Sequence, residues 1–144
     1  EQGVKKALKF LQSKVVKERE KKLQKDMKEF SQKYILEAKL NIIEHNYKKA
    51  DENYQKILKY NRSDENLFNY AKFLKKQNQI SKSILYYEET LKIRRNLAKE
   101  NPSAYNSAVA KTLNNLANLY SDNNQLEESE KAYLEALNLY RDLA

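Results

Sequence analysis

The apolar residues of this chain recur at spacings of three and four, which places them on one face of a helix. Close to the C-terminus, one such stripe consists of Leu113, Leu116, Ala117 and Tyr120. A short polar stretch follows, and a second stripe with the same period consists of Leu126, Ser129, Tyr133, Ala136, Leu137 and Tyr140. Two stripes joined by a short polar turn predict two helices that pack on each other as a hairpin.

This hairpin pattern occurs three times along the chain. Three segments that start at Ala38, Ala71 and Ala117 align without a gap. The twelfth residue after each start is small, the sixteenth is Tyr and the twentieth is Leu. These residues are Ala50, Ser83 and Ser129, then Tyr54, Tyr87 and Tyr133, then Leu58, Leu91 and Leu137. Agreement at several positions in three copies predicts an array of helical hairpins that bury a continuous core.

Small residues mark the point where the two helices of each hairpin are expected to cross. Ala117 and Ser129 occupy it in the third copy, and a large side chain there would push the axes beyond their usual separation of about 8–10 Å. The intervening turn is expected to consist of Ser121, Asp122, Asn123 and Asn124, and Asn tolerates the left-handed conformation that ends many helices. We expect a turn or capping role for His45 in the first copy, because a general base needs an orienting partner and a cleft.

The matched positions resemble the tetratricopeptide repeat (TPR), whose consensus is W-x2-L-G-x2-Y followed by A-x3-F. The third copy matches it at Leu113, Leu116, Ala117, Tyr120, Ser129 and Tyr133. The second copy matches it at Leu67, Tyr70, Ala71, Leu74, Ser83 and Tyr87, and the first at Ala38, Ala50 and Tyr54. The resemblance covers residues 31–144 and implies an all-α fold. It implies a right-handed α-solenoid of about three TPR-like helical hairpins, preceded by a long N-terminal helix.

The third copy is separated from the second by extra residues. Ala38 and Ala71 are 33 residues apart, whereas Ala71 and Ala117 are 46 apart. We expect the extra residues to lengthen two helices, with Asn101 as N-cap and Pro102 as the first residue of the second one. This long spacing resembles the extended repeats of kinesin light chains and their bacterial relatives, and it does not imply a motor.

The N-terminal residues carry two stripes that differ in phase. The first consists of Val4, Leu8, Leu11 and Val15, and the second of Val16, Leu23, Met27, Phe30 and Tyr34. They predict either one long helix or two helices with a slight break near 13–17. The predicted organisation is a basic helix over 1–30, as a cap or degenerate repeat, and a repeat domain over 31–144. The domain has hairpins over about 31–60, 64–99 and 102–144.

The composition excludes most classes of enzyme. The 144 residues include one Gly, one His and no Cys. One Gly cannot build the glycine-rich loops that hold phosphates or dinucleotides, and the lack of Cys excludes zinc clusters and thiol nucleophiles. Adjacent acidic pairs such as Glu88 and Glu89 point about 100° apart on a helix, so they do not converge. We therefore predict that the chain is not an enzyme and uses no cofactor and no metal.

Positive charge is concentrated at the N-terminus. The net charge is +8, and residues 1–33 hold eleven Lys and Arg residues against five acidic ones. A basic helix is typical of proteins that bind nucleic acid or an anionic surface, which is the alternative function. Lys far outnumbers Arg, and no aromatic platform accompanies the Lys residues, which disfavours nucleic acid.

The resemblance places the first helix of each hairpin on the concave wall of the solenoid. We expect this wall to bind a peptide segment of a partner protein, because Asn side chains bond peptide backbone and Lys attracts carboxylates. The candidate residues are Lys39, Phe68, Asn69, Lys72, Lys75, Lys111, Asn114 and Asn118. TPR domains that hold chaperone C-terminal carboxylates use a Lys and Asn clamp. Asn69 and Lys111 match this clamp, whereas Ile35, Lys39 and Asn115 do not, so we do not expect chaperone-tail binding.

The expected partner is therefore a protein or peptide, and the chain is a candidate homo-oligomer. Self-association is expected through the N-terminal helix or through the C-terminal end, because repeat arrays expose apolar surface where they are uncapped. No run of about 18 apolar residues is present to span a membrane. The lack of Cys and of an apolar leader segment favours the cytoplasm.

Overall fold

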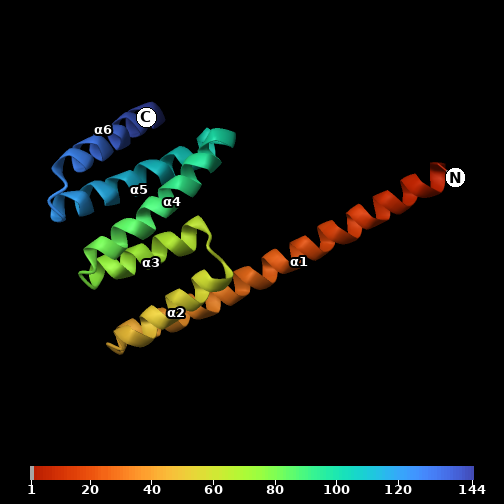
Figure 1. Cartoon of the computed structure of the whole chain (residues 1–144), viewed down its shortest axis with the longest axis horizontal. Coiled ribbons are helices and arrows are strands. Elements are labelled where there is room, and N and C mark those ends of the chain that lie inside the picture. Colours follow the sequence, from red (N-terminus) through yellow and green to blue (C-terminus); the bar gives the residue numbers. More distant parts are fainter. Residues whose placement is uncertain (1) are drawn as a thin grey trace. The chain divides into compact units, whose positions relative to one another are not determined.

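The computed structural model describes residues 2–144, and all of its regular structure is helical. Six helices follow one another: α1 (Gln2–Ile43), α2 (Tyr47–Tyr60), α3 (Asp64–Lys76), α4 (Ile80–Glu100), α5 (Pro102–Asp122) and α6 (Leu126–Leu143) (Figure 1). They form two compact units, the first ending at Asn61 and the second beginning at Arg62. Within the units, α1 packs on α2, and α3 to α6 pack in succession. The predicted all-α fold is confirmed.

The same turn closes each of the three hairpins. His45, Asn78 and Asn124 adopt the left-handed conformation, with φ of 59°, 56° and 60°. The amide that follows each of them donates to a carbonyl five residues back, as Gln125 does to Tyr120 O at 2.7 Å. This arrangement satisfies carbonyls that the helix end leaves without a partner. The predicted turn role of His45 is confirmed. The turn expected from Ser121 to Asn124 is confirmed at Asn123 and Asn124, whereas Ser121 and Asp122 still belong to α5.

Small residues meet where the helices of each hairpin cross, as predicted. Ala71 and Ala117 are fully buried, and the serine hydroxyls opposite them donate to their carbonyl oxygens. The distances are 2.7 Å from Ser83 Oγ to Ala71 O and 2.8 Å from Ser129 Oγ to Ala117 O. In the first hairpin the crossing pair is Ala38 and Ala50, both with no exposed surface. A larger side chain at any of these positions would separate the helices.

The second unit is built around one continuous core. Leu113, Leu116 and Leu119 of α5 are at most 2% exposed, because α4 packs on one side of α5 and α6 on the other. Asn101 Oδ1 caps α5 by accepting from the amide of Ala104 at 3.2 Å, and Pro102 is its first residue. This confirms the helix start expected from the Asn-Pro pair.

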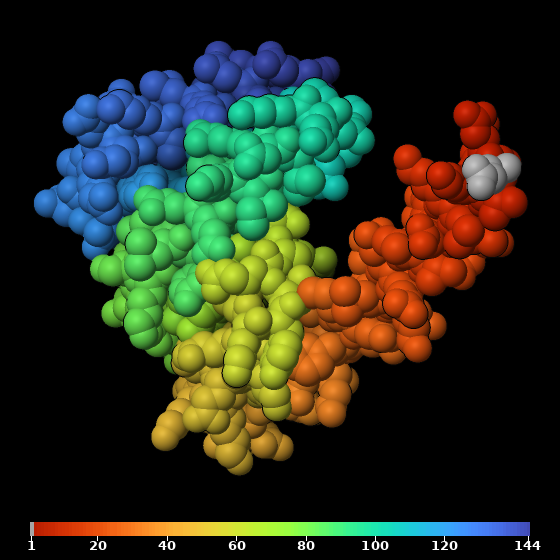
Figure 2. Space-filling model, turned by 45° about the vertical axis from the view of Figure 1, so that its right-hand side comes forward, coloured from red at the N-terminus to blue at the C-terminus, as the bar shows by residue number. Residues whose placement is uncertain are grey.

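Helix α1 is one uninterrupted helix of 42 residues, which confirms the first of the two predicted alternatives, one long helix without a break near 13–17. Its C-terminal part packs on α2, where the rings of Phe30 and Tyr60 lie 5.1 Å apart and Asn61 Nδ2 donates to Ser31 Oγ at 3.2 Å. Every side chain from Gln2 to Asp26 is exposed. Figure 2 shows this stretch standing clear of α2. Residue 1, where the predicted basic helix begins, lies outside the described residues.

Candidate functional site

Seven of the eight candidate residues lie in the second unit, on α3 and α5. Lys39 lies on α1 in the first unit, where its side chain is exposed. We define the α3/α5 surface as Asn69, Lys72 and Lys75 of α3 together with Lys111, Asn114 and Asn118 of α5. Lys72, Lys111 and Asn114 are exposed, whereas the other three are half-buried. The helical spacing of three and four residues brings each triplet to one face of its helix.

Phe68 belongs to the core rather than to the exposed part of this face. It is 6% exposed, and its ring meets that of Tyr87 edge to face at a centroid distance of 5.3 Å. The Nζ atom of Lys111 lies 5.5 Å from the Phe68 centroid, so α3 and α5 lie next to each other here. A cation above a ring is attracted by the negative face of its π system. Phe68 therefore acts on the surface indirectly, by holding the ammonium group of Lys111.

A buried arginine beneath the surface was not singled out from the sequence. Arg94 of α4 is 8% exposed, and its Nε donates to Asp64 Oδ2 at 2.8 Å. Its Nη1 donates to Thr112 Oγ1 at 3.0 Å and to the carbonyl of Ala108 at 3.3 Å. The guanidinium also lies 4.5 Å from the centroid of Phe68. A single side chain thereby ties α3, α4 and α5 together under the α3/α5 surface.

The sequence did contain a signal for Arg94. It occupies the buried stripe of α4, between Leu91 and Ala98, where an apolar residue would be usual. A charge in such a stripe is almost always paired. Its partners could not be identified from the sequence alone, because they lie thirty residues before it and eighteen after it.

The two asparagines of α5 differ in what they can offer a ligand. The hydroxyl of Tyr133 on α6 donates to Asn118 Oδ1, which occupies that oxygen and fixes the amide. Asn114 is exposed one turn earlier. An amide can donate and accept at once, which suits the backbone of an extended peptide. Asn114 is therefore the more accessible of the two, and Asn118 is the more rigid.

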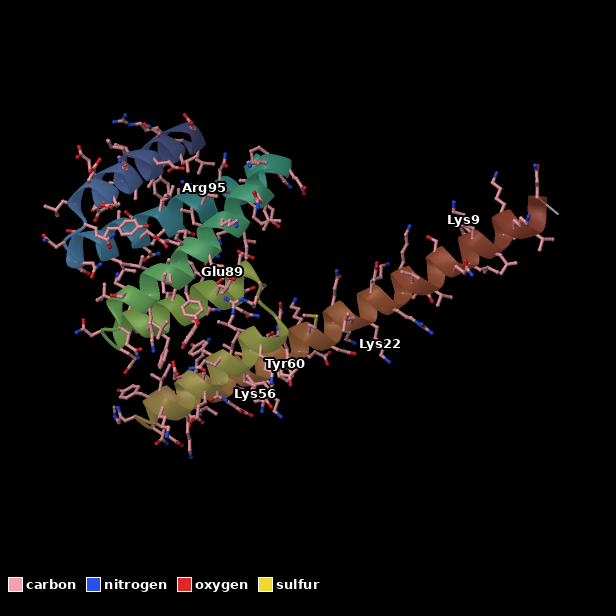
Figure 3. The ribbon with its side chains drawn as sticks, in the orientation of Figure 1. Lys9, Lys22, Lys56, Tyr60, Glu89 and Arg95 are labelled. Atoms are coloured by element: carbon pink, nitrogen blue, oxygen red, sulfur yellow. The ribbon has the colours of Figure 1, made fainter. Side chains whose placement is uncertain are left out.

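A separate pair of hollows lies between α4, α5 and α6. The larger is about 410 Å³ and is lined by Glu88, Leu91, Lys92, Arg95, Asn96, Lys99 and Tyr120. Arg95 projects from α4 and its Nη2 donates to Glu135 of α6 at 2.7 Å (Figure 3). Tyr120 donates to Glu88 Oε1 at 2.6 Å, and burial together with this bond raises the pKa of the phenol. None of the candidate residues lines this hollow. Its exposed lining residues can therefore serve as controls in experiments on the α3/α5 surface.

The described residues contain no cluster suited to metal chemistry. No group of three or more His, Asp or Glu side chains in residues 2–144 could hold a metal ion. His45 Nδ1 lies 3.0 Å from the hydroxyl of Tyr47 in an exposed turn. No helix in the described part of the chain is long and apolar enough to cross a membrane.

Comparison with known proteins relates the last hairpin to a repeat family and the fold to a solved structure. Residues 109–144, from the middle of α5 to the end of α6, match the sequence profile of the tetratricopeptide repeat. No curated protein matches the chain. The N-terminal domain of stress-induced protein-1 (STI-1) from C. elegans has a similar fold, with a TM-score of 0.62 and 15% identity. The alignment covers 78% of this chain and 87% of that one.

Residues 109–144 are therefore similar to a tetratricopeptide repeat of the kinesin-light-chain type, and the likeness to STI-1 shows that the chain has the fold of such repeats. TPR domains are in general protein–protein interaction modules and are typically non-catalytic. The resemblance predicted from the repeated Ala, Tyr and Leu positions is thereby confirmed.

Proposed function

We propose that this chain is a non-catalytic scaffold that binds a peptide segment of a partner protein on the α3/α5 surface. The observation that carries the proposal is the set of exposed Lys and Asn side chains above the buried Arg94 network. Arg94 and Phe68 hold α3, α4 and α5 in a fixed arrangement. A rigid surface loses little conformational entropy when a ligand binds, so more of the contact energy appears as affinity.

The chemistry of the surface favours an extended segment with acidic side chains. Lys72 and Lys111 place ammonium groups on neighbouring helices, and each can pair with a carboxylate of the ligand. Asn114 lies one turn from Lys111 and can bond the peptide backbone. Lys39 lies on α1 in the first unit and stays a separate candidate for peptide binding. The absence of Cys supports a reducing compartment such as the cytoplasm.

Site-specific photo-crosslinking tests the surface. A photoreactive amino acid replaces Lys72 or Asn114 in one pair of variants, and Lys92 or Lys99 in a control pair that lines the hollow beside α4. All four positions are exposed, so folding is preserved, and circular dichroism verifies it. We expect the first pair to crosslink a discrete protein from a lysate of the source cells. Crosslinking only from the control pair would contradict the assignment.

Substitution then measures the contribution of the charges. The triple variant Lys72→Ala, Lys111→Ala, Asn114→Ala is expected to reduce capture of the crosslinked partner at least tenfold, because each charged hydrogen bond contributes about 1.5–3 kcal/mol. Lys92→Ala, Lys99→Ala is the matched control and should leave capture unchanged. Equal capture by all forms would refute the proposal.

One observation supports the alternative of an anionic partner. The stretch from Gln2 to Asp26 exposes nine Lys and Arg side chains against three acidic ones, including Lys9 and Lys22 (Figure 3). Binding of this kind releases counterions, so affinity for nucleic acid falls steeply with salt. Titration of a fluorescent single strand at two salt concentrations, with and without residues 1–26, tests it. Binding that survives the truncation would count against this alternative.

A further inference from the structure

Among the described residues, each of the two units exposes an apolar stripe along one helix. The α1 stripe consists of Val4, Leu8, Leu11 and Val15, which are 66%, 52%, 57% and 47% exposed. The α6 stripe consists of Leu126, Tyr133, Leu137 and Tyr140, which are 64%, 40%, 45% and 44% exposed. Contiguous apolar surface of this kind marks interaction sites in soluble proteins.

The two stripes have compatible geometry. Each follows helical spacing, so its side chains form one ridge along one helix. The α1 stripe spans about 16 Å and the α6 stripe about 21 Å, at a rise of 1.5 Å per residue. The face of α6 next to this stripe, with Ser129, Ala132 and Ala136, is buried within the second unit. The α6 stripe is therefore presented by a helix that is already held in place.

Charge distinguishes between the possible pairings of these stripes. The segment from Gly3 to Lys17 contains five Lys residues and no acidic residue. Helix α6 contains five acidic residues and two basic ones. Glu130 lies beside its stripe, and Glu127 lies further round the same side, where it pairs with Lys131. Two α1 stripes in parallel would bring like positive charges together, and two α6 stripes would bring like negative charges together. Only the mixed pairing of α1 with α6 joins opposite charges.

We propose that the α1 stripe of one copy of this chain packs on the α6 stripe of a second copy. The apolar side chains bury one another, while Lys5 or Lys14, which flank the α1 stripe on its two sides, faces the flank of α6 that carries Glu127 and Glu130. Each copy carries one stripe of each kind, so the contact joins two different surfaces. Only four apolar side chains contribute from each side, so the association is weak and depends on concentration.

A complementation experiment tests this assembly. Leu8→Ser, Leu11→Ser removes the α1 stripe, and Leu137→Ser, Tyr140→Ser removes the α6 stripe. All four side chains are exposed, so both variants should fold, and circular dichroism verifies it. In sedimentation velocity at low salt, we expect the mean mass of the unaltered chain to rise with concentration. Each variant alone should remain monomeric, and an equimolar mixture should form a dimer and nothing larger, because one intact stripe of each kind remains.

Each other outcome overturns the proposal in a specific way. An unaltered chain that stays monomeric up to millimolar concentration rules out the contact. Self-association of the variant without the α6 stripe would show that α1 pairs with α1. Self-association of the variant without the α1 stripe would show that α6 pairs with α6. A mixture that remains monomeric would also refute the pairing.

Charge reversal provides a second test that leaves the apolar stripes intact. Glu127→Lys, Glu130→Lys should weaken self-association at least tenfold at low salt, because α6 then repels the Lys-rich helix. Mixing this variant with Lys5→Glu, Lys14→Glu should restore pairing between the two different chains. Failure of the mixture to associate would show that these charges do not face one another.

Discussion

Helix α5 and the N-terminal half of α1 carry similar apolar patterns, but the apolar face of α5 is buried and that of α1 is exposed. In α5, Leu113 and Leu116 are 2% and 1% exposed, because α4 and α6 cover the two sides of the helix. In α1, Leu8 and Leu11 follow the same spacing and are more than half exposed. The comparison shows that periodicity determines which face of a helix is apolar. Whether that face is buried depends on the presence of a neighbouring helix.

Truncation of one leucine in each region should give the largest difference. Leu116→Ala leaves a cavity between α4, α5 and α6 and should lower the free energy of unfolding by about 2–5 kcal/mol. Leu11→Ala removes a side chain that packs on nothing in its own unit and should change it by less than about 0.5 kcal/mol. Urea unfolding followed by circular dichroism measures both. Equal effects would show that the stretch Gln2–Asp26 is packed within the monomer.

Two adjacent arginines provide the next comparison. Arg94 and Arg95 each pair with a carboxylate, but the Arg94 side chain is 10% exposed and that of Arg95 is 47% exposed. Arg94→Ala leaves Asp64 and Thr112 without their donor and should destabilise the second unit by about 2 kcal/mol, less than for a fully buried pair. Arg95→Ala should have an effect of about 0–1 kcal/mol. Thermal unfolding of the two variants in parallel measures the difference, and similar values would contradict a structural role for the buried pair.

Alkaline pH should weaken the second unit through its tyrosines. Burial raises the pKa of Tyr87 above the ordinary value of 10.0, and among the described residues its hydroxyl has no hydrogen-bond partner. The unfolded chain therefore loses this proton at lower pH than the folded chain does. Its contribution to stability is complete below pH 10 and is lost as the pH rises above it.

The expected loss from Tyr87 is at most about 1.4 kcal/mol for each pH unit above 10. Thermal unfolding between pH 8 and 11 measures it. Tyr87→Phe keeps the packing against Phe68 but removes the proton, so its melting temperature should fall less steeply above pH 10. If the melting temperatures of the variant and the unaltered chain fall equally steeply with pH, Tyr87 is excluded as the source of the alkaline loss of stability.

The smallest expected effect concerns the turn between α5 and α6. Asn124→Ala forces a residue with a β-carbon and no polar side chain into the left-handed conformation and should destabilise the protein by about 1 kcal/mol. Asn123→Ala, one residue earlier at φ of −93°, should lower the free energy of unfolding by only about a few tenths of 1 kcal/mol. Urea midpoints compare the two. An equal loss in both variants would show that backbone conformation does not dominate at this turn.

Much of the fold could be predicted from local signals in the sequence. The Asn-Pro pair at 101–102, the small residues at the helix crossings and the turn residues His45 and Asn124 all have the predicted roles. Each of these roles depends on interactions within a few residues or on one helix pair.

The candidate surface was predictable only in part. Helical spacing correctly brought Lys72, Lys111 and Asn114 to exposed faces of α3 and α5. The same spacing could not show that Phe68 is covered, because that depends on where α4 and α5 lie against α3. The partners of Arg94 could not be predicted for the same reason, because they lie on α3 and α5. Peptide binding by this surface stays a prediction until the crosslinking experiment is done.

The helices, their turns and the repeated hairpin follow from local signals in the sequence, because backbone propensity, capping and periodicity act over a few residues. The packing of the helices sets which apolar faces are buried, why Arg94 is enclosed and why Asn118 is held by Tyr133. Those properties depend on the close approach of side chains that are far apart in the chain. The contrast between buried Leu116 and exposed Leu11 has this origin, since the two residues have the same chemistry and only one has a neighbour on every side.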